Sequence, residues 1–171
     1  MASRCGCTYT QSIYRCFTRL GRYGSISDQI ACGCNRAHLG VAAHWVGEVT
    51  TPPIGAGDLL LLGSGSGRTA SLINHAHTAA TFGATVSLLT IDAGSPLGEL
   101  ADRTSGSVIV LPAPTPKLED GGIGSGVKSV QPMGTLFEQT LGLTCDAMVL
   151  LLMEQSGQGT DEMFTRHANM E

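Results

Sequence analysis

Hydrophobic and polar residues alternate along most of the chain in blocks that predict strands and helices in turn. Short apolar runs bounded by turn residues indicate buried strands, whereas apolar residues three or four positions apart indicate a helix. These patterns predict strands over 41–46, 58–63, 85–91 and 108–111. They predict helices over 69–82, 96–101 and 134–153. Because strands and helices alternate, we expect an α/β fold: a three-layer, doubly wound sandwich of about five parallel strands with helices on both faces.

Two segments have no clear period. Residues 1–40 show neither a clean strand nor a clean helix pattern, and the best local interpretation is a helix over 9–20. Residues 114–130 are rich in Pro, Gly and Ser, which predicts a loop. The expected organisation is therefore a single domain, in which 41–171 form the regular α/β unit and 1–40 an atypical N-terminal segment.

A glycine-rich turn lies between the strand at 58–63 and the helix at 69–82. A strand, a glycine turn and a helix start build an anion cradle, because the free N–H groups and the positive dipole end of the helix face the ligand. Hydroxyl side chains in the turn can donate to phosphate oxygens. The expected phosphate-binding residues are Ser64, Gly65, Ser66, Gly67, Arg68 and Thr69. The turn has no lysine and no GK[ST] ending, so it is not a nucleotide P-loop.

Composition narrows the class of protein. The chain has 171 residues, of which 42% are hydrophobic and 14% charged. This balance favours a packed domain with buried surfaces, and contacts between subunits, over disorder. The net charge of −4 argues against a general nucleic-acid binder.

No uninterrupted apolar run reaches the roughly 18–20 residues of a membrane helix. The apolar segment 147–153 is expected to be part of a buried helix. The N-terminus has no apolar signal core, so we expect a cytoplasmic protein with no membrane partner.

Cysteines are unevenly placed, because five of the six precede residue 35. The two Cys-x-Cys pairs lack the spacing of two to four residues that structural zinc usually requires. We therefore expect free thiols and no metal site. His75 and His77 lie two apart on a predicted helix and do not share a face, so solvated positions are expected for both.

Several blocks of the sequence resemble one known family. Residues 64–69 resemble the phosphate loop of the sugar isomerase (SIS) fold, which is a flavodoxin-like sandwich. Blocks at 46–52, 95–102 and 111–113 are similar to one branch of that fold, the 6-phospho-3-hexuloisomerases. The most specific marks are Gln131-Pro132-Met133-Gly134, within the block 129–139, and the ending Arg166-His167-Ala168-Asn169.

The resemblance implies a reaction and an assembly. Members of this family interconvert D-arabino-hex-3-ulose 6-phosphate and D-fructose 6-phosphate through a cis-enediol, in the ribulose monophosphate route of formaldehyde fixation. That reaction formally requires neither a redox cofactor nor a metal ion. The resemblance also implies a homotetramer with sites at subunit interfaces.

Site residues follow from the matching blocks. Glu138 is the expected catalytic base, and its apolar neighbours Leu136 and Phe137 are expected to make its carboxylate a stronger base. His167 is expected to reach the site of a neighbouring subunit, where it opens the sugar ring or relays protons. Sugar hydroxyls are expected to meet the loop residues Glu48, Thr50 and Thr51.

The first 40 residues depart from the family pattern. The family's first glycine loop is matched only by 21–25, which makes Ser25 and Arg22 weaker candidates for substrate binding. Our hypothesis is that this segment is divergent or read partly in a shifted frame, which would impair the first strand and the first substrate loop. Resequencing the gene tests it, and a clean frame with matching relatives contradicts it.

Three other functions remain open at this point. The chain could be a non-catalytic phosphosugar-binding module, or an aldose–ketose isomerase on the same fold. A dinucleotide-binding oxidoreductase is the third, because Gly65-x-Gly67-x-x-Ala70 fits a G-x-G-x-x-A pattern and Asp92 follows the next strand. The paired serines suit a single phosphate better.

Overall fold

A computed structural model describes residues 16–20, 38–113, 129–167 and 169 of the chain. Its strands are β1 (Cys16–Leu20), β2 (Ala43–Trp45), β3 (Leu59–Gly63), β4 (Thr85–Thr90) and β5 (Val108–Val110). Its helices are α2 (Ala70–Thr81), α3 (Pro96–Arg103), α4 (Thr135–Ser156) and α5 (Thr160–Phe164). All strand pairs are parallel, in the order β2-β1-β3-β4-β5. This is the doubly wound, flavodoxin-like order, so the predicted fold class is confirmed.

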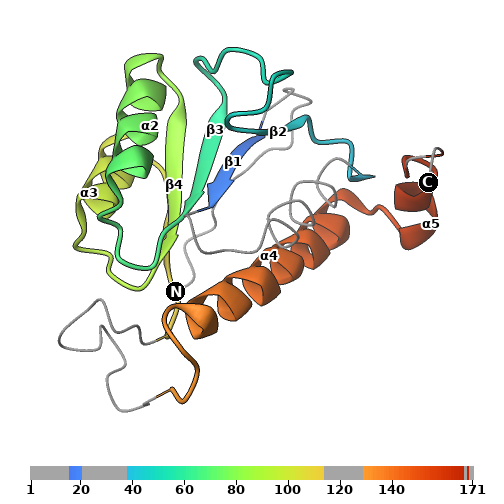
Figure 1. The fold of residues 1–171 in the computed structure, drawn as a ribbon. Coiled ribbons are helices and arrows are strands. Elements are labelled where there is room, and N and C mark those ends of the chain that lie inside the picture. Colours follow the sequence, from blue (N-terminus) through green and yellow to red (C-terminus); the bar gives the residue numbers. More distant parts are fainter. Residues whose placement is uncertain (1–15, 21–37, 114–128, 168, 170–171) are drawn as a thin grey trace, which may run out of the picture.

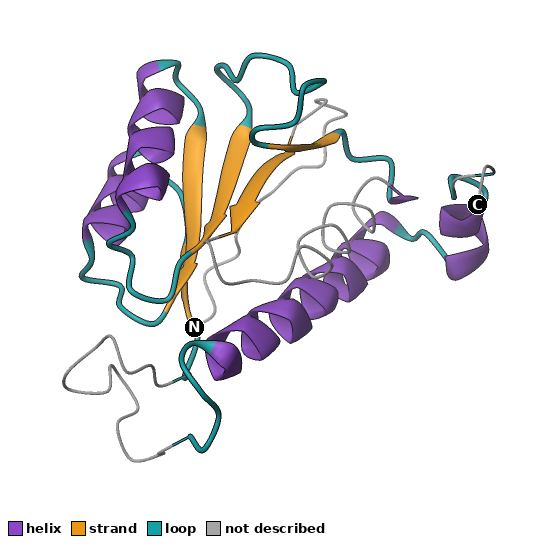
Figure 2. Cartoon of the chain, viewed as in Figure 1, coloured by secondary structure: helices purple, strands orange, loops and turns teal. Residues whose placement is uncertain are grey.

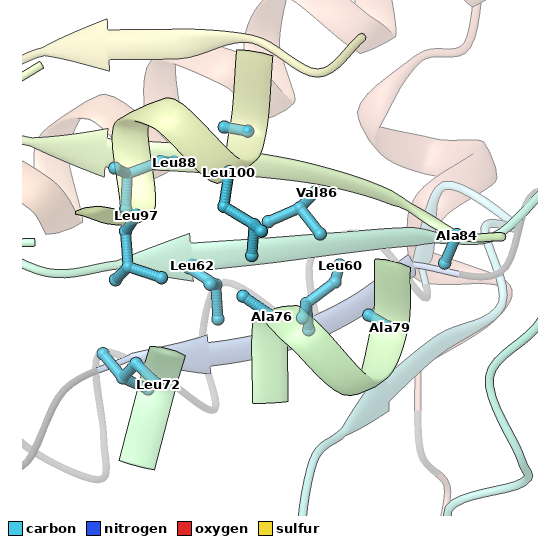
Figure 3. Packing of buried hydrophobic residues seen from close by; sticks show 11 residues of the cluster. Leu60, Leu62, Leu72, Ala76, Ala79, Ala84, Val86, Leu88, Leu97 and Leu100 are labelled. Carbon is cyan, nitrogen blue, oxygen red and sulfur yellow. The ribbon is translucent and has the colours of Figure 1, made fainter. Parts of the chain in front are cut away.

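Helices cover both faces of the sheet, as Figures 1 and 2 show: α2 and α3 lie on one face and α4 on the other. The strand sequences explain this, because neighbouring apolar residues point to opposite faces. Leu60 and Leu62 pack with Leu72 and Leu97 on the α2–α3 face (Figure 3). Leu61, between them, belongs to the second core under α4. Two buried faces require strands that are apolar throughout, which is what the sequence contains.

Helix α4 packs on its face of the sheet through a single narrow stripe of buried side chains. Its buried residues are spaced four apart: Phe137, Leu141, Cys145 and Val149. The rest of its apolar surface faces outward, with Leu143 73%, Leu150 65% and Leu151 57% exposed. The prediction that 147–153 is a buried helix is therefore wrong for the single chain, because only one side of α4 meets the sheet.

The first strand corrects a second expectation. Residues 16–20 form β1, between β2 and β3 in the sheet, and not the end of a helix over 9–20. Both neighbours of β1 come later in the chain. Pairing at long range decides its conformation, and a local pattern carries no sign of it.

Among the described residues, α4 is long and apolar enough to cross a membrane by length and composition alone. From the sequence we expected no membrane helix, because we considered only uninterrupted apolar runs. A mean hydropathy over 18 residues tolerates a few polar residues, and α4 passes by that measure. The core helix of a soluble protein passes the same test, and α4 lies along the sheet (Figure 1). The finding is weak evidence for a membrane span.

A small, mostly apolar cavity of about 140 Å³ lies between α2 and the loop after β2. It is lined by Val46, Thr51, Pro52, Ile54, Leu60, His75, Thr78 and Ala79. His75 is half-buried there rather than solvated, because the loop 46–54 covers its side of the helix, whereas His77 is exposed as expected.

Candidate active site

The glycine-rich turn lies at the carboxyl edge of the sheet, directly after the central strand β3. The strand order reverses between β1 and β3, and ligands of doubly wound sheets bind in the crevice at such a switch point. The segment 64–69 therefore occupies the place where this fold binds ligands. Ser64 is buried, while Ser66 and Thr69 are half-buried.

Backbone hydrogen bonds fix the shape of the turn. The Ser64 N–H donates to the Leu89 carbonyl at 2.9 Å, and the Ile91 N–H donates to the Gly65 carbonyl at 3.0 Å, which extends the β3–β4 pairing into the turn. The Gly67 N–H then donates to the Ser64 carbonyl at 3.2 Å and closes it. The loop is thus held in place before any ligand arrives.

The start of α2 is open to an anion. Within the described residues, its N-cap Thr69 makes no side-chain capping bond, and its first turn has no acidic residue. The neighbouring helix α3 differs, because the Ser95 hydroxyl accepts from the Gly98 N–H and Glu99 stands in its first turn. The first N–H groups and dipole of α2 therefore face the turn uncompensated by a side chain.

Two buried hydroxyl residues support the turn, and sequence reasoning missed their part in it. Thr90 donates from Oγ1 to the Gly65 carbonyl at 3.1 Å. Ser95 lies so close to Gly67 that a Cβ there would stand 1.9 Å from Ser95 Oγ, and Gly67 has a φ of +61°. Thr90 is the last residue of β4, and Ser95 lies in the loop that follows it. In the sequence, the only sign of their role is that they are polar residues at or just after the carboxyl end of a buried strand.

Arg68 meets a partner that its position in the sequence does not reveal. Its Nη2 lies 2.8 Å from Asp92 Oδ2, and Oδ1 of the same carboxylate accepts from the Gly94 N–H at 3.0 Å. The ion pair joins the phosphate loop to the loop that precedes α3. A dinucleotide-binding site would need Asp92 to bind the ribose, but Asp92 is paired with Arg68.

The start of α4 lies against the same turn. A Cβ at Gly65 would stand 3.5 Å from the Phe137 ring, so the glycine allows the first turn of α4 to approach. Glu138 is half-buried in that first turn, and its Oε1 lies 3.9 Å from where a Cβ at Gly134 would be. The Glu138 carboxylate therefore lies near the start of its own helix.

His167 lies elsewhere in the same chain. It follows α5, beyond the far end of α4, as Figure 1 shows. A helix of 22 residues is about 33 Å long, so one chain does not bring Glu138 and His167 to one site. His167 is exposed on the surface of the chain.

The remaining candidate substrate-binding residues belong neither to the phosphate loop nor to the start of α4. Glu48 and Thr50 are exposed on the loop after β2, and Thr51 donates from its hydroxyl to the Trp45 carbonyl. Strand β1 separates β2 from β3. Ser25 and Arg22 lie outside the described residues.

Comparison with known proteins supports the resemblance. No family model matches the chain. A 3-hexulose-6-phosphate isomerase of Bacillus subtilis is 44% identical over 151 residues, which cover 88% of this chain and 76% of the relative. One from Mycobacterium gastri is 40% identical over 134 residues, covering 78% and 63%.

Solved structures show the same fold. A crystal structure of a Methanococcus jannaschii protein, reported to infer the function of 3-hexulose-6-phosphate isomerase, matches with a TM-score of 0.72 and 28% identity. The match covers 92% of this chain and 78% of that one. A sugar-phosphate isomerase homologue from Listeria monocytogenes, at 18% identity and a TM-score of 0.64, shares the fold over 90% of this chain and 75% of that one.

The fold and the relatives together show the class: the chain is a phosphosugar isomerase of the SIS fold. Within that class, the chain belongs to the 3-hexulose-6-phosphate isomerase family. The resemblance is confirmed, and the chain is an isomerase. It spans about three quarters of the Bacillus subtilis relative, by the 76% coverage.

Proposed function

We propose that this chain interconverts D-arabino-hex-3-ulose 6-phosphate and D-fructose 6-phosphate, with Glu138 as the base. The observation that carries the proposal is the position of Glu138 in the first turn of α4, next to Phe137, whose ring lies against Gly65 of the phosphate loop. A phosphate in the cradle anchors one end of the substrate, and the carboxylate then stands beside its carbon chain. The family membership supplies the identity of the sugar.

The chemistry needs one proton to move between two carbons. The Glu138 carboxylate removes the proton from C3 of fructose 6-phosphate, and the electrons form the C2–C3 double bond of an enediolate. The base then returns a proton to C2, while the hydroxyl proton of O3 passes to O2 and C3 becomes the carbonyl carbon. A positioned base of this kind typically accelerates a reaction by about 10²–10⁴-fold.

Fructose 6-phosphate labelled with ¹³C at C2 tests the proposal. Isomerisation converts the labelled carbon from a carbonyl or hemiketal carbon to a carbinol carbon, which NMR separates. Fructose without phosphate is expected to bind far more weakly. Equal affinity for the two sugars would count against the cradle.

Ser66→Ala is expected to weaken phosphosugar binding by about 1–3 kcal/mol, because a hydroxyl donor to the phosphate is lost. Calorimetry with fructose 6-phosphate measures the change. Ser71→Ala is the matched control, since Ser71 is exposed on α2 just beyond the loop. Equal affinities of the two variants would remove Ser66 from the phosphate site.

A second copy of the chain completes the site in this proposal. His167 lies too far from Glu138 to serve the same site within one chain, whereas a neighbouring subunit can bring it there. The outward apolar face of α4, with Leu143, Leu150 and Leu151, offers a surface for such contacts. We propose a homotetramer, located in the cytoplasm and acting in the ribulose monophosphate route.

Leu150→Lys is expected to shift the protein from an oligomer toward the monomer, because a charge would be buried in the interface. Light scattering coupled to gel filtration measures the mass. Phe82→Lys, at a residue that is 60% exposed after α2, serves as the control and is expected to leave the mass unchanged. An unchanged mass for Leu150→Lys would contradict an interface over this part of α4.

Mixing two inactive variants tests the shared site. Subunits carrying Glu138→Gln and subunits carrying His167→Asn are unfolded together and refolded at equal concentration. If each site takes Glu138 from one subunit and His167 from its partner, about a quarter of the wild-type turnover should return. Absence of any recovery in hetero-oligomers would mean that each site takes both residues from one subunit, which would contradict the shared site.

A further inference from the structure

The C-terminal segment is held against the start of the regular fold by one side chain, Arg166. Its Nη1 donates to the His38 carbonyl at 2.8 Å and to Gln158 Oε1 at 2.9 Å. Its Nη2 donates to Glu162 Oε1 at 3.0 Å. Three acceptors from three parts of the chain therefore meet one guanidinium: the segment before β2, the turn after α4, and α5 itself.

Gly40 lies beside this contact. Gly40 has a φ of +81°, and a Cβ at that position would lie 3.7 Å from the Arg166 guanidinium carbon. The guanidinium thus lies over the chain just before β2. The hydrogen bond from Arg166 to the His38 carbonyl joins residues 128 positions apart, and it fixes where the chain runs after α5.

His167 follows Arg166 directly, and its ring contacts two other rings. The ring centroids of His167 and His38 are 5.1 Å apart, and those of His167 and Phe164 are 5.9 Å apart. The His167 N–H donates to the Phe164 carbonyl at 3.0 Å. These contacts give the exposed His167 side chain a defined position.

We propose that Arg166 is a positioning residue that fixes the His167 imidazole on the surface presented to the neighbouring subunit's site. This inference rests on the proposed function, in which His167 serves that site. Arg166 itself touches no substrate. It holds α5 and residue 38 together, and so sets the direction in which the imidazole faces.

Arginine is suited to this role and lysine is not. The planar guanidinium presents donors in a rigid fork that meets several acceptors in fixed directions, whereas an ammonium is a single flexible point charge. The side chain of Arg166 is 35% exposed and that of Glu162 51%, so their ion pair contributes little to global stability. Loss of the guanidinium should therefore disturb the position of the segment and leave the core folded.

The test compares kcat and KM for fructose 6-phosphate in Arg166→Met, His167→Asn and the double variant. We expect each single change to lower kcat by about 10²-fold, with KM little changed, and the double variant to be no slower than His167→Asn. Arg166→Lys should not restore kcat. Gln158→Ala, which removes one of the three acceptors, should cause a smaller loss.

A matched control and a second measurement separate positioning from a general loss of structure. Arg103→Met removes an exposed arginine at the end of α3 and should keep full activity. In Arg166→Met, amide hydrogen exchange should become about tenfold faster at residues 163–167 and stay unchanged in β3 and β4.

Three results would overturn the inference. They are a full kcat in Arg166→Met, losses that multiply in the double variant, and unchanged exchange in residues 163–167. A full kcat in His167→Asn would overturn it together with the role of His167. The reaction and the role of Glu138 are judged separately, by the variant at that position.

Discussion

Glu138→Gln is expected to lower kcat by about 10²–10⁴-fold while fructose 6-phosphate still binds. The amide has nearly the same shape as the carboxylate but cannot take a proton from carbon. Because the residue lies in the first turn of α4 beside the phosphate loop, the cradle itself should be unaffected. Steady-state turnover and calorimetric affinity, measured on the same sample, separate the two effects.

Glu154→Gln is the matched control for this change. Glu154 is exposed near the other end of the same helix, so its replacement removes an equal charge far from the loop. It should leave both kcat and affinity unchanged. Full turnover in Glu138→Gln would refute the role of Glu138 as the base.

Gly67→Ala is expected to destroy the phosphate cradle and to destabilise the fold by about 2–4 kcal/mol. Alanine is strained at a φ of +61°, and its methyl group would stand 1.9 Å from Ser95 Oγ and 2.4 Å from Ser95 Cβ. Ser95 is fully buried and caps α3, so it has no room to withdraw. The loop 64–67 must then move away from the β4–α3 connection.

Urea unfolding and phosphosugar affinity measure the two consequences. Gly55→Ala provides the control, because no atom lies within 4 Å of a Cβ at that position. It should leave both quantities unchanged. A Gly67→Ala protein with wild-type stability and affinity would contradict the close approach of the two loops.

Much of the fold could be predicted because local pattern and global fold agree over the described residues 41–113 and 134–153. The run Leu59–Leu62 is apolar at every position and is buried on both faces, and the spacing of apolar residues in α2 and α3 is helical. Strand β1 could not be found, since its conformation comes from pairing with β2 and β3. The short helix α5 was also missed, because five polar-rich residues carry no period.

The site was predicted in part, for a related reason. The glycine turn is one continuous motif, so its residues are close together in sequence as well as in space. The contacts of Thr90, Ser95 and Asp92 with that turn join different βα connections, and no spacing in the sequence encodes them. The roles assigned to Glu138 and His167 came from the family resemblance and stay predictions.

Fructose 6-phosphate incubated with the protein in D₂O is the most direct test of the central claim, that the chain catalyses 2,3-enediol chemistry. NMR identifies the carbon that gains deuterium. We expect deuterium at C3, because the base removes and returns the proton at that carbon. Deuterium at C1 would instead indicate aldose–ketose isomerisation, and binding without any exchange would indicate a phosphosugar-binding protein that does no chemistry; either result would contradict the account.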